Sequence, residues 1–216
     1  MKRREFSQAA AGAALAVSAF PSLVQAQAAA LRAGKDYQVV DPVAAVEAPA
    51  GKIEVVEFFW YSCPHCNTFE PTLAEWVKKL PKNVAFRRVH VAFNASFVPQ
   101  QKLHLALEAM GLMEKLHAKV FLAIHAEKLN LAKSEAIVDW VVKQGVDKAK
   151  FLEQYNSFSV STKATKATQL MNAYKVEGVP ALGVAGRFYT DGSMAGSMER
   201  ALQVVEALVA GQKTAA

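Results

Sequence analysis

The two cysteines of this 216-residue chain constrain its fold and chemistry more than any other feature. Cys63 and Cys66 are separated by two residues and follow directly on a strongly apolar run. A lone Cys-x-x-Cys is either half of a metal site or a redox-active pair. A structural zinc site uses four thiolate or imidazole ligands; the sequence has no second cysteine pair, and the histidines outside the loop are scattered. The spacing therefore favours a redox pair, and we expect no metal and no cofactor other than the Cys63–Cys66 disulfide itself.

The start of the chain has the composition of an export signal. Residues 2–4 are basic, residues 9–24 are apolar, and Ala26 and Ala28 offer two cleavage points. The apolar stretch is too short and too rich in alanine for a membrane span. The basic start also resembles a twin-arginine signal, so the export route stays open. We expect residues 1–28 to be a signal peptide and the mature protein to work outside the cytoplasm.

That compartment bears on how the cysteines are interpreted. An oxidising environment would normally favour a structural disulfide. A disulfide across two residues closes only a very small loop, however, and so restricts the unfolded chain little. A redox-active role therefore explains this spacing better than a structural disulfide does. The formal charge of +6 is spread along the chain without interleaved aromatic residues, so we do not expect nucleic-acid binding.

Hydrophobic periodicity divides the remaining chain into three blocks. The first predicts strand, helix and strand, with the two strands parallel and joined by a right-handed crossover. The second is helical throughout, with Ser134 as one helix cap, and the third predicts two strands on either side of Gly186 and a final helix. The expected strands are 37–40, 52–60, 84–91 and the pair around Gly186; the expected helices are 68–80, 101–112, 114–127, 133–144, 148–156, 159–174 and 198–210.

Cys63 is expected where a strand ends and a helix begins. Backbone N–H groups and the positive end of the helix dipole then face its sulfur and favour the thiolate. The dipole contributes about 0.3–2 kcal/mol, which lowers the thiol pKa by about one unit. His65 adds a second contribution when it is protonated or donates to the sulfur, whereas Cys66 is more covered and keeps a higher pKa. A stabilised thiolate favours the reduced form, so we expect the disulfide to be an oxidant.

Residues 58–66, Phe-Phe-Trp-Tyr-Ser-Cys-Pro-His-Cys, resemble the active site of the DsbA family of thioredoxin-fold oxidases. The resemblance extends over nearly all of the chain after the signal, through residues 88–91 and 178–181. It implies a thioredoxin-like α/β fold with a mixed central sheet, formed by residues 29–97 and 175–216, and an inserted all-helical domain at residues 98–174. It also implies an active site composed of Cys63, Pro64, His65 and Cys66.

The function implied by the resemblance is thiol:disulfide exchange in the periplasm. The Cys63–Cys66 disulfide would be donated to reduced, unfolded polypeptides that have just been exported. A membrane quinone reductase of the DsbB type would then reoxidise the pair. We expect a monomer, because the exported chain begins almost at the sheet and leaves no dimerisation segment.

The resemblance assigns four further residues. Val179 and Pro180 correspond to a cis-proline loop beside the active-site sulfur, which pairs with a substrate strand. The alternative is a trans turn proline at a strand edge; most X-Pro bonds are trans, so the expectation of a cis bond comes from the resemblance alone. Glu57 corresponds to a buried acid that moves protons to and from Cys66; alternatively, it is an edge glutamate whose carboxylate reaches solvent. Arg88 stands where the family usually has a lysine, and pairing with it would keep Glu57 ionised and weaken its role in proton transfer.

Three other functions remain open from the sequence. A disulfide isomerase or reductase of the same fold is the nearest, although it usually needs a dimerisation segment. A cytochrome-maturation reductant is a second, against which the histidine in the loop argues. A non-catalytic chaperone or binding module would not need Cys63 at all. The remaining histidines are interpreted as packing or surface residues; they are His90, His104, His117 and His125.

Overall fold

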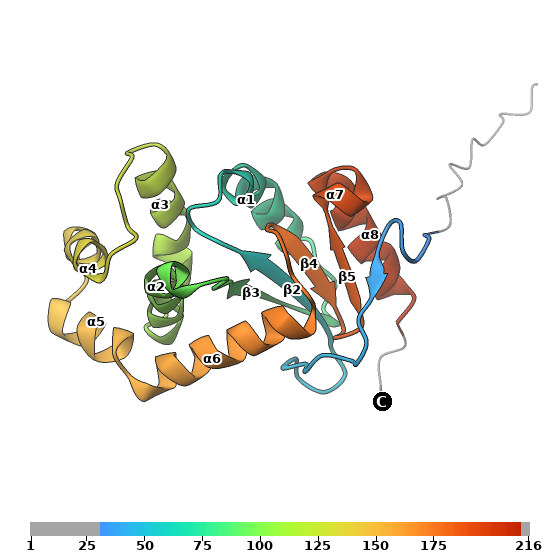
Figure 1. Cartoon of the computed structure of the whole chain (residues 1–216), viewed down its shortest axis with the longest axis horizontal. Helices are drawn as coiled ribbons and strands as arrows, with labels where there is room; N and C mark the ends of the chain where they lie inside the picture. Colours follow the sequence, from blue (N-terminus) through green and yellow to red (C-terminus); the bar gives the residue numbers. More distant parts are fainter. Residues whose placement is uncertain (1–30, 213–216) are drawn as a thin grey trace, which may run out of the picture. The chain divides into compact units, whose positions relative to one another are not determined.

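The computed structural model describes residues 31–212 (Figure 1). The predicted signal peptide and its two cleavage points lie outside the described residues. Between residues 31 and 212, the structure contains no helix with the length and apolar character needed to cross a membrane.

Five strands form one mixed sheet. They are β1 (Gln38–Val39), β2 (Ile53–Phe59), β3 (Val84–His90), β4 (Ala181–Val184) and β5 (Phe188–Asp191). Their order across the sheet is β1-β5-β4-β2-β3. β2 and β3 are parallel, as the predicted crossover requires, and the other neighbouring pairs are antiparallel. The mixed sheet and the predicted edge strand near residue 38 are therefore confirmed.

Every residue of β2 is buried, which explains its nearly unbroken apolar sequence. On one face of the sheet, Val55 packs in a core with α1 (Pro64–Val77) and α8 (Met198–Ala210). On the other face, Phe58 packs with the C-terminal part of α6 (Phe158–Ala173). The strand that leads to the cysteines is thus held between helices on both faces.

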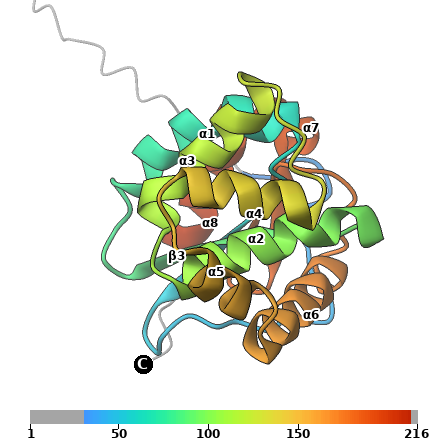
Figure 2. The same cartoon turned by 90° about the vertical axis from the view of Figure 1, so that its left-hand side faces the viewer.

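The residues between β3 and β4 are helical, as predicted (Figure 2). Their core consists of fully buried apolar side chains, among them Leu103, Leu116 and Ile137. Phe59 and Tyr61 belong to the same core, so the helical insertion packs directly against the segment that precedes the cysteines. After a 3₁₀ turn (Ala95–Phe97), the helices are α2 (Val98–Ala109), α3 (Met113–His125), α4 (Ser134–Lys143), α5 (Lys148–Tyr155) and α6.

Three local predictions need correction. α1 begins at Pro64 rather than at residue 68, because proline is well suited to the first helical position. Ser134 does not cap α4: Lys133 occupies the cap position, and the Ser134 hydroxyl instead hydrogen-bonds the Tyr155 hydroxyl at 3.1 Å. A short helix, α7 (Gly192–Ala195), lies between β5 and α8, where the sequence pattern did not indicate one.

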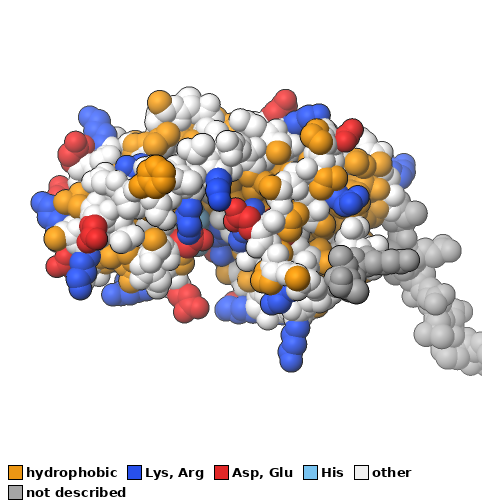
Figure 3. Space-filling view, turned by 90° about the horizontal axis from the view of Figure 1, so that it is seen from below, with side chains coloured by type: hydrophobic (Ala, Val, Ile, Leu, Met, Phe, Trp, Pro, Cys, Tyr) orange, Lys and Arg blue, Asp and Glu red, His pale blue; other side chains and the backbone are white. Residues whose placement is uncertain are grey.

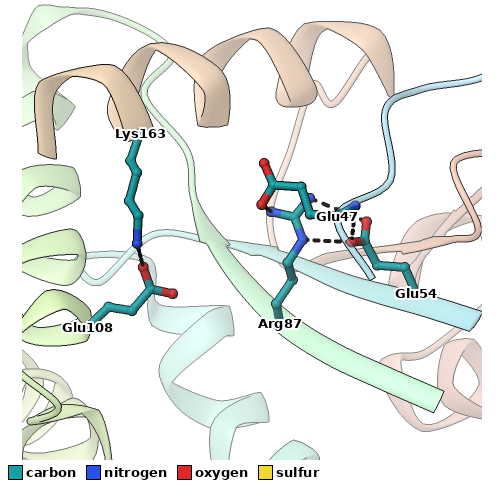
Figure 4. Close-up of polar contacts among 5 residues, drawn as sticks. All are labelled: Glu47, Glu54, Arg87, Glu108 and Lys163. Carbon is teal, nitrogen blue, oxygen red and sulfur yellow. Dashed lines mark hydrogen bonds and ion pairs between the residues drawn. The ribbon is translucent and has the colours of Figure 1, made fainter. Parts of the chain in front are cut away.

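Two groups of ion pairs link the elements on one side of the sheet (Figure 4). Arg87 on β3 contacts the buried Glu54 of β2, with Nε 3.0 Å from Oε1, and reaches Glu47 at 3.6 Å. Lys163 on α6 pairs with Glu108 on α2 at 2.8 Å. Four of these five residues line a groove of about 850 Å³ between β3, α2 and α6: Glu47, Arg87, Glu108 and Lys163. Figure 3 shows acidic and basic side chains close together in the middle of the face seen from below.

Candidate active site

Cys63 lies at the junction of β2 and α1, as predicted. Its backbone N–H donates to the carbonyl of Trp60 at 3.0 Å and closes a turn whose central residues are Tyr61 and Ser62. Cys63 is also the N-terminal cap of α1, and its sulfur accepts a hydrogen bond from the backbone N–H of Cys66 at 3.4 Å. The turn therefore places the sulfur of Cys63 at the positive end of the helix.

The two sulfurs have opposite electrostatic surroundings. The pKa of Cys63 is lowered from its ordinary value of 9.0 to about 6, chiefly by a hydrogen bond from the Cys66 thiol and, against the effect of burial, by the backbone N–H groups of Cys66 and His65. The charge of His65 makes a smaller contribution than these hydrogen bonds. Cys66 is fully buried, and burial raises its pKa. The thiolate at Cys63 is thus stabilised mainly by the helix terminus and the neighbouring thiol, and less by the histidine in the loop.

A titration of the reduced protein checks this asymmetry. We expect one thiolate to form with a midpoint near pH 6, because Cys63 ionises there, while Cys66 stays protonated. The increase in ultraviolet thiolate absorbance with pH measures the midpoint. Cys66→Ala removes the thiol donor and should raise it, because the largest stabilising contact is lost. A midpoint at the ordinary value of 9.0 in the unmodified protein would contradict the assignment.

Val179 and Pro180 complete the site from a distant part of the chain. The Val179–Pro180 peptide bond is cis, so the prediction made from the family resemblance is confirmed and the trans alternative is wrong. The Cys63 thiol donates to the Val179 carbonyl at 3.3 Å, although the two residues are 116 positions apart. β4 begins directly after Pro180 and pairs with β2, and this pairing brings the two loops together.

Glu57 lies in the middle of β2 and is 1% exposed, so the alternative of a solvent-reaching edge glutamate is wrong. Its Oε2 lies 3.1 Å from Nε of Arg88, although the two atoms are not aligned as a hydrogen bond. Burial outweighs this ion pair and raises the pKa of Glu57 to about 8. The expectation that Arg88 keeps Glu57 ionised is therefore not met. Glu57 is close enough to Cys66 for its charge to raise the pKa of that thiol.

Glu70 is a residue of the site that the sequence argument missed. It lies on α1 four positions after Cys66, on the same side of the helix, and is buried. Arg88 donates to it from Nη2 at 2.8 Å, and Nε2 of His117 lies 3.4 Å from its other oxygen. Burial opposes its ionisation, but hydrogen bonds and charges from His117 and Arg88 together lower its pKa. The guanidinium of Arg88 contacts both Glu57 and Glu70, so it stabilises the charge of Glu57 less than it would if Glu57 were its single partner. The four-residue spacing between Cys66 and Glu70, which places both on one side of a helix, was the sequence signal that could have identified Glu70.

His90, His104 and His117 are buried around Tyr61, so the prediction that they are packing residues is correct. Burial lowers the pKa of each, that of His90 to about 3, and so favours the neutral imidazole. His125 is partly exposed, and its Nε2 lies 2.8 Å from the Tyr61 carbonyl. The sequence did not indicate that all four would meet one tyrosine, since they come from three separate elements.

The groove between β3, α2 and α6 is not where the sulfurs lie. Neither cysteine lines it, and neither does Val179. It is bordered by Arg88, His90 and His104 and therefore adjoins the buried polar residues rather than the reactive atoms. The groove is therefore separate from the loop junction where Cys63 meets Val179.

Comparison with known proteins agrees with this geometry. Residues 88–203 match the model of the DSBA-like thioredoxin domain family. The thiol:disulfide interchange protein DsbA of Burkholderia cepacia is 45% identical over 187 residues, which cover 87% of this chain and 88% of that protein. The DsbA of Pseudomonas aeruginosa is 42% identical over 191 residues, covering 88% of this chain and 90% of that protein.

The fold comparison gives the same result. A crystal structure of Pseudomonas aeruginosa DsbA superposes with a TM-score of 0.79 at 42% identity, covering 83% of this chain and 93% of that one. The predicted thioredoxin-like fold is thereby confirmed. The sequence identity, the fold and the paired thiols lead to one conclusion: the chain belongs to the DSBA-like thioredoxin domain family and is a thiol:disulfide oxidoreductase.

Proposed function

We propose that this protein is an oxidase that donates its Cys63–Cys66 disulfide to reduced, unfolded polypeptides newly exported to the periplasm. The observation that carries the proposal is the asymmetry of the two thiols. Cys63 has a pKa lowered to about 6 at a helix terminus, whereas Cys66 is fully buried and its pKa is raised. Cys63 is therefore suited to be displaced as a thiolate, and Cys66 is suited to be protonated when the disulfide is reduced.

The reaction begins with the oxidised enzyme. A substrate thiolate attacks Sγ of Cys63, forming a mixed disulfide and breaking the bond to Cys66. A second substrate thiolate then attacks the substrate sulfur of that bond and displaces Cys63 as a thiolate. Two electrons pass from the two substrate thiols to the enzyme, and the substrate gains a disulfide. Because the pKa of Cys63 is low, it is a good leaving group in the second step.

Cys66 needs a proton when it leaves, since burial disfavours its thiolate. Glu57 is buried nearby, and its pKa of about 8 keeps it largely protonated at neutral pH. We therefore assign Glu57 as the proton donor to Cys66. Burial raises that pKa most; the charge of Arg88 lowers it, and the charge of Glu70 raises it.

The direction of electron flow follows from the thiolate. An ordinary thiol with a pKa of 9.0 is still protonated at pH 7, whereas Cys63, with a pKa of about 6, is ionised. The stabilisation of the reduced form at pH 7 therefore comes from the difference between pH 7 and the Cys63 pKa of about 6. That difference favours the reduced form by at most about 1.4 kcal/mol, or about 30 mV. The disulfide is correspondingly more oxidising than one between two ordinary thiols.

Substrate docking is assigned to the loop around Val179. Its carbonyl lies beside Cys63 and can accept a hydrogen bond from an extended chain once the thiol no longer donates to it. Apolar side chains adjoin the site: the ring centroids of Trp60 and Phe97 are 4.3 Å apart, and Phe93 is 38% exposed. Such neighbours suit unfolded chains with varied apolar side chains.

The partners follow from the same reasoning. The relatives described above are named thiol:disulfide interchange proteins, which supports exchange with protein thiols. We assign reoxidation to a membrane quinone reductase of the DsbB type and the working state to a monomer. The export signal assigned to residues 1–28 supports a periplasmic location.

Equilibration with glutathione buffers tests the direction of the reaction. We expect the Cys63–Cys66 couple to be clearly more oxidising than thioredoxin, which lies at about −270 mV, and the oxidised protein to form a disulfide in a reduced model peptide. The fraction of reduced protein at each glutathione ratio gives the potential. A value as low as that of thioredoxin would remove the oxidase assignment and support a reductase.

A further inference from the structure

The turn that presents Cys63 is held from outside by side chains. Its two central residues are Tyr61 and Ser62, and the Cys63 N–H closes it onto Trp60. The hydroxyl of Ser62 accepts a hydrogen bond from Nε2 of Gln100, on α2, at 2.7 Å. The position of the reactive sulfur therefore depends on groups outside the loop that carries it.

Tyr61 is contacted through both of its backbone polar groups. Its N–H donates to Nε2 of His90, on β3, at 3.3 Å, and the other ring nitrogen of His90 bonds the Val91 carbonyl. Its carbonyl accepts from Nε2 of His125, in the last turn of α3, at 2.8 Å. The peptide groups on either side of the Tyr61 Cα are thus fixed by histidines of two different elements.

The hydroxyl of Tyr61 is contacted as well. It lies 2.9 Å from Nδ1 of His117, on α3, and 3.5 Å from Nδ1 of His104, on α2. Nε2 of His117 faces the carboxylate of Glu70, which favours the tautomer with the proton on that nitrogen and leaves Nδ1 to accept from the tyrosine. Because the ring of Tyr61 is completely buried, these contacts are shielded from water.

Apart from His90 on β3, the side chains that contact the turn come from one part of the chain. His104, His117 and His125 all come from the helical insertion, and so does Gln100, whereas the cysteines belong to the sheet and α1. We propose that His117 and His125 are positioning residues for thiol exchange: they hold Tyr61 and so make the orientation of Cys63 depend on the helical insertion. The inference rests on the proposed exchange at Cys63 and adds to it the residues that orient the attacked sulfur.

His125 is the better residue for a test, because it is partly exposed and makes a single polar contact with the turn. His125→Leu removes the donor to the Tyr61 carbonyl, whereas His125→Gln keeps an N–H at a similar reach. We expect the leucine variant to exchange with a reduced model peptide about tenfold more slowly, since small misplacements of reacting groups have effects of this size or larger. We also expect the pKa of Cys63 to rise, and the glutamine variant to recover most of both properties.

Val120→Ala is the matched control. Val120 lies on α3 in the same buried core and has no polar side-chain group, so its truncation weakens the insertion without removing a hydrogen bond to the turn. Thermal unfolding shows when the two variants are comparably destabilised. If Val120→Ala slows exchange and raises the Cys63 pKa as much as His125→Leu does, the positioning role is wrong. It is also wrong if His125→Leu leaves both values unchanged in an assay where the unmodified protein is active. Inactivity of the unmodified protein would instead contradict the proposed function.

Discussion

Replacing Cys63 with serine is expected to abolish disulfide transfer, with a loss of roughly a thousandfold or more in the rate of peptide oxidation. The reason is stoichiometric as well as kinetic. Without Cys63, the chain cannot store two oxidising equivalents, and the only remaining thiol, Cys66, is fully buried with a raised pKa. Mass spectrometry of a reduced two-cysteine peptide, before and after incubation with the oxidised protein, measures the product directly.

The companion variant separates attack from resolution. Cys66→Ser keeps the reactive Cys63 and removes the sulfur that would release it, so a mixed disulfide between Cys63 and a disulfide-bonded peptide should accumulate. The complex is recognised by its mass and by its disappearance on reduction. Undiminished oxidation by the Cys63→Ser protein would eliminate the enzyme assignment and leave a binding or chaperone role.

Replacing Glu57 with glutamine is expected to stabilise the reduced protein above pH 8 and to have a much smaller effect near pH 5. Glu57 has a folded-state pKa of about 8, compared with an ordinary value of 4.5. Between these values the folded chain binds a proton that the unfolded chain does not, so stability decreases as pH rises through this window. The full cost, reached above pH 8, is about 5 kcal/mol at most. Glutamine cannot ionise and avoids that cost.

Urea unfolding at several pH values measures the effect, and Glu54→Gln is its control. Glu54 lies on the same strand and is also 1% exposed, but it accepts hydrogen bonds from Arg87 and from the backbone N–H of Glu47. Its replacement removes charge-assisted bonds and should destabilise the protein by about 1.5–3 kcal/mol across the same range. If Glu57→Gln followed the control, with a loss of stability at pH 8 and above, the raised pKa assigned to Glu57 would be wrong.

The local pattern of the chain was sufficient to predict the framework of the active site. β2 has a long apolar sequence because it is covered on both faces, and the turn residues after it mark the start of α1. Whether Pro180 lies beside Cys63 cannot be read from local periodicity. It depends on β4 pairing with β2, and the family resemblance supplied that information.

The polar interior was harder to predict, because it depends on tertiary distances. The ionisation of Glu57 is set by three competing quantities: its burial, its distance from Arg88, and the share of that guanidinium taken by Glu70. Pairing alone suggested an ionised acid, and burial reversed the result. The histidines around Tyr61 were interpreted individually, since nothing in their spacing shows that helices of the insertion converge on one residue.

The order of elements in the chain also has a consequence for folding. The carbonyl of Val179 that borders Cys63 is 116 residues further along, and five helices lie between β3 and β4. Closing so long a loop costs conformational entropy before the strands pair, whereas helices of the insertion form from local contacts. While the chain is being synthesised or refolded, Cys63 and Cys66 are present long before the loop that covers them. The helix terminus that lowers the pKa of Cys63 forms locally, whereas the Val179 carbonyl reaches the sulfur only when β4 pairs with β2. The exchange site is therefore complete only when the sheet is.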